Sequence, residues 1–270
     1  MNAELEVLLR IASEAARVVM QVYARPFDVD YKAPQDPVTE ADRLANALIC
    51  EQLEREFPGV PIVAEESDPA TFGDFRKSDR AFFVDPVDGT REFVDKNGEF
   101  AVMIGLLEGG RAVASVIDAP ARDEVFAGWV GQGAFRLAAG QRTPISVSNI
   151  ADVTQSRLVG SRSHRSPALE RALAKLKPRD VLVMGSAGLK GTLVASAAVE
   201  AYVAPGYAGK RWDACATDAL VTAAGGKLTD THGDPIDYRA ASLSNDRGLI
   251  ASNGHIHDAL IQAFADLREA

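Results

Sequence analysis

Two aspartates in the run Asp85-Pro86-Val87-Asp88-Gly89-Thr90 have the residue types and spacing expected of a metal-binding turn. Pro86 fixes φ between the carboxylates, and the Gly-Thr pair suits a turn that follows them, so both side chains can converge on one point. Carboxylate oxygens gathered without matching His or Cys favour Mg²⁺, and Mg²⁺ on carboxylates favours phosphate chemistry. The run therefore predicts a magnesium site that acts on a phosphate compound.

Three further acidic residues lie where predicted strands or helices begin or end. Glu65 and Glu66 follow the apolar run 60–64, and Asp213 follows Trp212 ahead of a predicted helix. The apolar run 81–84 predicts a buried strand that leads into the turn, and ligand sites of open α/β sheets tend to lie at such strand ends. Simpler explanations stay open, because Asp-Pro and Asp-Gly are common turn dipeptides and Asp213 suits a helix N-cap.

Local structure alone also explains two other candidate catalytic residues, Asp42 and Thr90. Thr39-Glu40-Ala41-Asp42 has the form of a capping box, which accounts for Asp42 without a catalytic role. Thr90 is similarly placed to cap the short segment 91–94. Helix capping and chemistry are therefore both open for these two side chains.

Two loops in the second half of the chain are suited to bind an anion. The segment 185–192 superficially resembles a P-loop, but its spacing is wrong for that motif. Its small residues at a predicted helix N-terminus still leave backbone N–H groups for a phosphate, and Lys190 adds a positive charge. The segment Ser161-Arg162-Ser163-His164 is a second such loop, or else an ordinary polar loop.

The elements that must position these residues follow from the hydrophobic pattern. Helices are predicted from Leu5 to near Arg25, and from Thr39 to before Pro58, with Leu44, Ala47, Leu48 and Leu53 facing inward. Strands are predicted at 60–64 and 81–85, a hairpin at 101–107 and 111–117 around Gly109-Gly110, and two short strands within 124–137. After about residue 149, strands at 157–160, 181–184, 201–203, 226–229 and 249–251 alternate with helices at 167–177, 188–199, 214–224 and 255–267.

This order predicts an N-terminal α+β part, residues 1–150, and a C-terminal α/β part, residues 151–270. The first part carries most of the candidate metal ligands, and the second carries Asp213 and the two candidate anion-binding loops. No linker of Pro or Ser separates them, so we expect the two parts to share a broad interface.

Composition excludes several classes of function. The chain has 270 residues, 47% of them hydrophobic, and a formal net charge of −9, which argues against binding nucleic acid polymers or anionic membranes. No stretch is apolar enough to cross a bilayer and the N-terminus is not a signal peptide, so we expect a cytoplasmic protein, with peripheral attachment to the inner membrane left open. Cys50 and Cys215 are expected to be reduced, each on a helix, and His232, His255 and His257 to lie on the surface.

At this point the motifs identify a family resemblance. The order "VTEAD", "AEES", "DPVDGT" and "WDACATDALVTAAGG", spanning residues 38 to 226, resembles the Mg²⁺-dependent, lithium-sensitive superfamily of inositol monophosphatases and 3′(2′),5′-bisphosphate nucleotidases. Further segments, "DGTREFVDKNGEF", "SRSH", "GSAGLK" and "AGKRWDACATD", are most similar to the nucleotidases of CysQ type. These hydrolyse 3′-phosphoadenosine 5′-phosphate, a by-product of sulfate assimilation.

The resemblance implies a layered αβαβα sandwich of the mixed α/β class, two or three Mg²⁺ ions, and hydrolysis by a metal-activated water without a phosphoenzyme. Asp42 and Thr90 would be the pair that takes a proton from the attacking water. A small phosphomonoester would be the substrate, and the protein would be a monomer or a homodimer. The implied metal ligands are Glu65, Asp85, the carbonyl of Val87, Asp88 and Asp213, and the implied substrate contacts are Gly89, Thr90, Ser161, His164, Ser186, Lys190 and Asp213.

Two departures from the family pattern bear on substrate choice. Some relatives have Gly at the position of Ser186, and the glutamate that inositol phosphatases place before their Trp-Asp has no counterpart, the region being occupied by residues 202–206. An inositol monophosphatase or related sugar phosphatase is therefore the nearest alternative. A haloacid-dehalogenase-type phosphatase is disfavoured, because its motif separates the two acids by one residue rather than two. A non-catalytic Mg²⁺ or nucleotide sensor is disfavoured as well, because it would be expected to lack a ligand or Thr90, and none is missing here.

Overall fold

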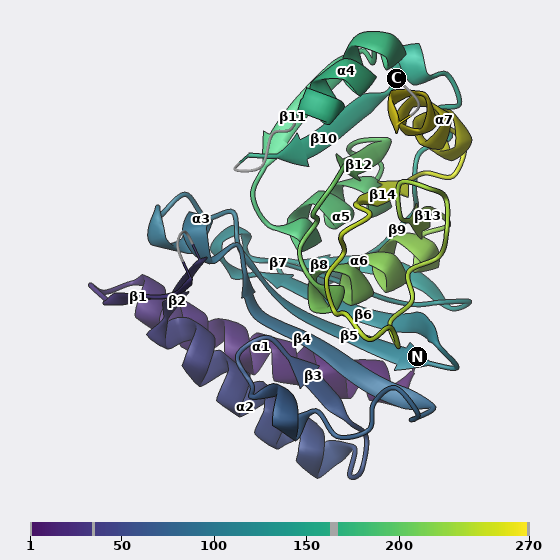
Figure 1. The fold of residues 1–270 in the computed structure, drawn as a ribbon. Coiled ribbons are helices and arrows are strands. Elements are labelled where there is room, and N and C mark those ends of the chain that lie inside the picture. Colours follow the sequence, from purple (N-terminus) through teal and green to yellow (C-terminus); the bar gives the residue numbers. More distant parts are fainter. Residues whose placement is uncertain (1, 34–35, 163–166, 269–270) are drawn as a thin grey trace.

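The computed structural model describes residues 2–33, 36–162 and 167–268, and its helices and sheets lie in five layers (Figure 1). Helices α1 (Ala3–Tyr23) and α2 (Glu40–Glu56) form the first layer and cover one face of a seven-stranded sheet. Their alanines and aliphatic residues pack against apolar side chains of that sheet. The two helices predicted in the first sixty residues are therefore present, and together they cover the sheet.

The seven-stranded sheet forms the second layer. Its strands run in the order β3-β4-β5-β6-β7-β8-β9, all antiparallel except the parallel pair β3 and β4. Gly109 and Gly110 turn the expected β5–β6 hairpin at positive φ. The bounds are β3 Ile62–Ala64, β4 Arg80–Asp88, β5 Ala101–Glu108, β6 Arg111–Ala119, β7 Glu124–Trp129, β8 Gly133–Ala138 and β9 Gln141–Ile145.

Helices α5 (Ala187–Ala195) and α6 (Arg211–Ala223) form the middle layer, between the two sheets. Helix α6 packs on β5 and β6, and α5 packs on α6 and β12. The largest apolar cluster joins residues of both halves, among them Met103, Leu189 and Leu220. The broad interface between the two parts is therefore present, while their division at residue 150 stays a prediction.

A five-stranded sheet and an outer pair of helices complete the stack. The strands run in the order β11-β10-β12-β14-β13, with β10 parallel to β11 and β12, and β14 antiparallel to its neighbours. Helices α4 (Pro167–Leu176) and α7 (His257–Arg268) cover the outer face. The strand bounds are β10 Arg157–Ser161, β11 Asp180–Met184, β12 Ala201–Ala204, β13 Lys227–Thr229 and β14 Leu249–Ser252. The αβαβα architecture is confirmed.

Smaller elements lie at the strand ends. Strands β1 (Val29–Ala33) and β2 (Asp36–Thr39) form a separate antiparallel pair, and the five-residue helix α3 (Thr90–Val94) follows β4. Strands β1 and β9 were not predicted, because their side chains are mostly exposed and show no apolar alternation. Strand β2 was not predicted either, because it has only four residues, one of them a proline. Short 3₁₀ turns occupy Pro69–Thr71, Pro120–Arg122 and Val153–Gln155.

Two expectations about burial need correction. On α2, Leu53 is buried and Leu48 is partly buried, as expected, whereas Leu44 is 44% exposed and Ala47 is also exposed. The buried face of the helix begins at Asp42 and continues through Ala45 and Ile49 to Leu53, so it passes beside Leu44 and Ala47. His257 is buried rather than on the surface, because its ring nitrogens bond to two buried hydroxyls.

Among the described residues, no helix has the length and hydropathy needed to cross a membrane.

Candidate active site

A β-bulge brings the two aspartates of the DPVDGT run to the same side of the sheet. Asp85 pairs with Met103 and Asp88 pairs with Ala101, so three steps along β4 match two along β5. In a regular strand these two residues would face opposite sides, and the extra residue of the bulge removes that difference. The N–H of Val87 donates to Oδ1 of Asp85 at 3.0 Å and fixes its carboxylate.

Asp213 reaches the same point from the C-terminal half. It is the third residue of α6, not its N-cap, and its Oδ2 accepts the N–H of Lys210 at 2.6 Å. A Cβ on Gly209 would lie 2.5 Å from Oδ2 of Asp213, so only glycine fits the turn before the helix. Oxygens of Asp85, Asp88 and Asp213 lie within 4.8 Å of one another.

The electrostatics of this carboxylate group favour a cation. Burial raises the pKa of Asp85 well above its ordinary value, and the charges of Glu65, Asp88 and Asp213 raise it further. Burial likewise raises the pKa of Asp213, followed by the charges of Asp88 and Glu65. Three convergent carboxylates of this kind are hard oxygen ligands that suit Mg²⁺, so the donor set fits the predicted metal.

Asp88 also joins the two halves of the molecule. Its Oδ1 accepts the N–H of Ala187 at 3.0 Å, and its Oδ2 accepts the N–H of Gly188 at 2.7 Å as well as the hydroxyl of Ser186. These donors lie at the N-terminus of α5, whose first N–H groups have no intrahelical acceptor. A strand end of the first sheet is thus fixed directly to the middle helical layer.

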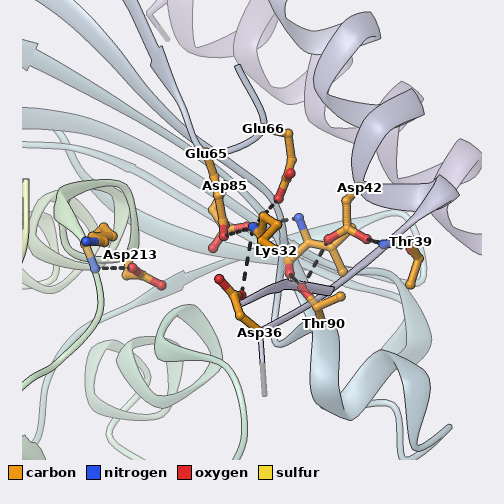
Figure 2. A network of polar contacts seen from close by, with 11 residues as sticks. Lys32, Asp36, Thr39, Asp42, Glu65, Glu66, Asp85, Thr90 and Asp213 are labelled. Atoms are coloured by element: carbon orange, nitrogen blue, oxygen red, sulfur yellow. Dashed lines mark hydrogen bonds and ion pairs between the residues drawn. The ribbon is translucent and has the colours of Figure 1, made fainter. Parts of the chain in front are cut away.

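Glu65 directly follows β3 and lies beside Asp85, outside the group of three converging aspartates, and a lysine binds it (Figure 2). The ammonium of Lys32, on β1, is 2.7 Å from Oε1 of Glu65, 2.7 Å from Oε1 of Glu66 and 4.0 Å from Oδ1 of Asp36. Burial opposes the charge of Lys32, but the two glutamates outweigh it and raise the pKa of the lysine. Sequence reasoning missed Lys32, because nothing in the local pattern marks β1.

Asp42 and Thr90 come together on the other side of the turn (Figure 2). Oδ2 of Asp42 accepts the backbone N–H of Thr39 at 2.8 Å and its hydroxyl at 2.6 Å, which forms the capping box of α2. The hydroxyl of Thr90 lies 3.1 Å from Oδ1 of Asp42 and 3.1 Å from the carbonyl oxygen of Val87. Burial raises the pKa of Asp42, which is 1% exposed.

A cavity of about 570 Å³ opens above these groups. The predicted residues Gly89, Ser161, Ser186 and Lys190 line it together with the carboxylates. Sequence reasoning did not single out the aromatic wall formed by Tyr202, Tyr207 and Trp212. Of these three residues, only Tyr202 lies in the segment 202–206 that the sequence analysis had marked as a departure from the family pattern. His164 lies outside the described residues.

Lys190 is more enclosed than the sequence suggested. It is 4% exposed, its ammonium donates to the carbonyl oxygen of Ser186 at 2.6 Å, and it lies 5.0 Å from the centre of the Tyr202 ring. Burial lowers its pKa, while the charges of Asp88, Glu92 and Asp213 oppose that shift. Ser186 itself has φ +54°, an uncommon conformation for a residue with a side chain. The lysine therefore supports a strained turn as well as lining the cavity.

Comparison with known proteins agrees with the fold and with the carboxylate site. The family described as "Inositol monophosphatase family" matches residues 2–269. The 3′(2′),5′-bisphosphate nucleotidase CysQ of Escherichia coli (strain K12) is 35% identical over 236 residues, which cover 87% of this chain and 93% of that protein.

Comparison with solved structures also places the fold in this family. The extragenic suppressor protein suhB from Bartonella henselae has a TM-score of 0.84 at 28% identity, covering 97% of this chain and 98% of the other. CysQ from Bacteroides thetaiotaomicron, described as a bacterial member of the inositol monophosphatase family, has a TM-score of 0.79 at 26% identity, covering 93% and 97%.

Proposed function

The chain belongs to the inositol monophosphatase family, and we propose that this phosphatase hydrolyses the 3′-phosphate of 3′-phosphoadenosine 5′-phosphate. The observation that carries the proposal is the 35% identity, over most of both chains, to proteins described as 3′(2′),5′-bisphosphate nucleotidases. The convergent carboxylates that line the cavity support a phosphate ester as the reacting group. We assign the activity to the cytoplasm, in keeping with two free cysteines.

Five groups of the chain would hold the metal in this proposal. Bound Mg²⁺ would lower the pKa of an attacking water and stabilise charge on the phosphate and its leaving oxygen. Two or three ions are proposed, as for the family. The ligands would be Glu65, Asp85, the carbonyl of Val87, Asp88 and Asp213.

Thr90 and Asp42 would handle the proton. Thr90 can orient an attacking water through its hydroxyl oxygen while its own hydrogen points to Oδ1 of Asp42, 3.1 Å away. Because Oδ2 of Asp42 is already used by Thr39, Oδ1 is the atom left to accept. A positioned carboxylate of this kind is a suitable general base.

The backbone of the turn would bind the reacting phosphate. Gly89 has φ +96°, and a Cβ there would lie 2.8 Å from the carbonyl oxygen of Glu99, so a side chain cannot be added without moving the turn. Gly89 and Thr90 begin α3, where N–H groups have no intrahelical acceptor and suit phosphate oxygens.

The second phosphate of the substrate requires a partner outside the carboxylate group. We assign it to Lys190, with hydroxyls of Ser161 and Ser186 and the ring of His164 completing the contacts. The first three of these line the same cavity as the carboxylates. Inositol 1-phosphate has no such second anion, so Lys190 would favour the bisphosphate.

A phosphate-release assay with Mg²⁺ tests the proposal, using 3′-phosphoadenosine 5′-phosphate, inositol 1-phosphate and fructose 1,6-bisphosphate as substrates. The highest kcat/KM is expected for the adenosine bisphosphate. A higher value for inositol 1-phosphate would support the second candidate, an inositol monophosphatase. That alternative is favoured by the likeness to an inositol monophosphatase of Thermotoga maritima, with a TM-score of 0.83 at 28% identity.

A further inference from the structure

Glu99 makes a three-point contact between the two halves of the molecule. It lies between α3 and β5, and its Oε1 accepts Nη2 of Arg162 at 2.6 Å. Its Oε2 accepts Nε of Arg162 at 2.9 Å and the backbone N–H of Gly185 at 2.7 Å. We call these three hydrogen bonds the Glu99 bridge. Both carboxylate oxygens are therefore engaged, and the side chain is only 14% exposed.

The bridge joins the ends of two neighbouring strands. Arg162 directly follows Ser161, the last residue of β10, and Gly185 directly follows Met184, the last residue of β11. The two strands are parallel with Ser161 opposite Met184, and the N–H of Arg162 donates to the carbonyl oxygen of Met184 at 3.1 Å. One carboxylate thus holds both strand ends against the turn that leads from α3 into β5.

The turn at Gly185 is also packed closely against α3. A Cβ on Gly185 would lie 2.4 Å from Cγ of Glu92, so the turn follows the position of that helix. The next residue, Ser186, holds its uncommon φ of +54° and donates its hydroxyl to Asp88. A strained residue persists only where its surroundings fix it from several sides. The Glu99 bridge supplies one of these constraints.

We propose that Glu99 is a positioning residue, which sets the distance between the substrate loops at Ser161 and Ser186 and the turn at Asp88 to Thr90. Glu99 and Arg162 are not among the residues that line the cavity, so they act through Ser161 and Gly185 rather than on the substrate. The inference rests on the proposed function, because Ser161 and Ser186 are substrate contacts only within it.

Ionisation of Glu99 agrees with this arrangement. Burial opposes its charge, but the hydrogen bonds from Arg162 and Gly185 outweigh burial and lower the pKa of the carboxyl. Hydrogen bonds to a charged group are the stronger kind, so the bridge is expected to be rigid at neutral pH.

Kinetics of Glu99→Ala and Arg162→Gln test the proposal. Each should raise KM for 3′-phosphoadenosine 5′-phosphate roughly tenfold, the scale of one charged hydrogen bond, and change kcat less than about twofold. The double variant should be no worse than Glu99→Ala, because Glu99→Ala already removes every bond of the bridge, including the two that Arg162→Gln removes. Glu6→Gln is the matched control, since it breaks a similar two-bond pair with Arg142, at 2.7 and 2.6 Å, away from the cavity.

Amide hydrogen exchange gives a readout that does not depend on the substrate. The N–H of Gly185 should exchange faster in Glu99→Ala and in Glu99→Gln than in the wild type, and should be unchanged in Glu6→Gln. If Glu99→Ala does not fold, Glu99→Gln carries the exchange measurement and Arg162→Gln carries the KM measurement.

Three results would overturn the inference: an unchanged KM, an equal KM increase in Glu6→Gln, or a loss confined to kcat. If the wild type does not hydrolyse 3′-phosphoadenosine 5′-phosphate, the proposed function fails. The bridge is then tested by Gly185 exchange and by KM for the phosphomonoester that the enzyme does hydrolyse.

Discussion

The hydroxyl oxygen of Thr90 lies 3.1 Å from Oδ1 of Asp42, although 48 positions separate the two residues in the sequence. Asp42 can serve both helix capping and proton transfer because it uses different oxygens for the two. Oδ2 caps α2 through Thr39, and Oδ1 faces Thr90. The two explanations left open by the sequence are therefore compatible.

Thr90→Val should remove the proton path while keeping the size of the side chain. We expect kcat to fall about a hundredfold or more, the scale of positioned acid–base groups, with KM little changed. Thr90→Ser retains the hydroxyl and should recover most of the rate. A Thr90→Val enzyme within threefold of the wild-type kcat would contradict the role of the Thr90–Asp42 pair.

Asp88→Asn should weaken both the metal site and the attachment of α5. An amide is a poorer metal ligand and its NH₂ group would face backbone N–H donors of Ala187 and Gly188. We expect a loss of at least about a thousandfold in kcat and weaker Mg²⁺ binding by calorimetry.

Asp118→Asn is the control for Asp88→Asn, because Asp118 is a buried carboxylate of the same sheet that bonds to Ser13 instead. It should leave kcat and Mg²⁺ binding unchanged. If Asp88→Asn retains more than a tenth of the activity at saturating Mg²⁺, Asp88 is not a metal ligand.

Lys190→Met removes the charge that we assign to the second phosphate and keeps the apolar stem. Binding of 3′-phosphoadenosine 5′-phosphate should weaken by roughly 1.5–3 kcal/mol, the scale of one charged hydrogen bond. Inositol 1-phosphate should be affected much less, and kcat/KM for both substrates is the measurement. Equal losses on both would mean that Lys190 serves the turn at Ser186, whose carbonyl oxygen it also binds.

His257 should make stability dependent on pH. It lies between Thr229 and Ser252, at 2.9 and 2.8 Å, and burial lowers its pKa from 6.5 to about 4. Between these values the unfolded chain binds a proton that the folded chain does not. The contribution of His257 to the free energy of unfolding is therefore fully present above pH 6.5 and is lost as pH falls toward 4. The loss amounts to about 3 kcal/mol.

Unfolding of His257→Gln between pH 4 and 7 checks this prediction. Denaturant titrations should show a flatter dependence of the free energy of unfolding on pH than in the wild type. Identical slopes for the two proteins would rule out His257 as the titrating group.

Much of this site could be predicted because its signals are local. A strand pattern followed by Asp-Pro-Val-Asp-Gly-Thr places two carboxylates at a strand end, whatever the rest of the chain does. Predicted Asp85, Asp88 and Asp213 do converge. The bulge that turns the first two to one side is also local, since it falls at the proline.

Other features depend on partners that no local pattern reveals. Lys32 lies on an exposed strand, and only the folded chain brings it to Glu65 and Glu66. On α2 the expected inward face is right at Leu53 and wrong at Leu44, because the buried side runs through Ala45 and Ile49 instead. His257 is buried because the hydroxyls of Ser252, in the preceding strand, and of Thr229, 28 residues away, satisfy its ring. The contacts of Lys32 and the Thr229–His257 contact are long-range, and long-range contacts of this kind override local hydropathy.

Internal competition tests the central claim most directly. Equal concentrations of 3′-phosphoadenosine 5′-phosphate and inositol 1-phosphate are followed together by phosphorus NMR with Mg²⁺, and the ratio of their decay rates gives the ratio of kcat/KM. We predict that the 3′-phosphate signal disappears first, that the 5′-phosphate signal persists as adenosine 5′-phosphate, and that excess chelator stops the reaction. Faster loss of inositol 1-phosphate, or release of the 5′-phosphate instead, would contradict the proposed nucleotidase.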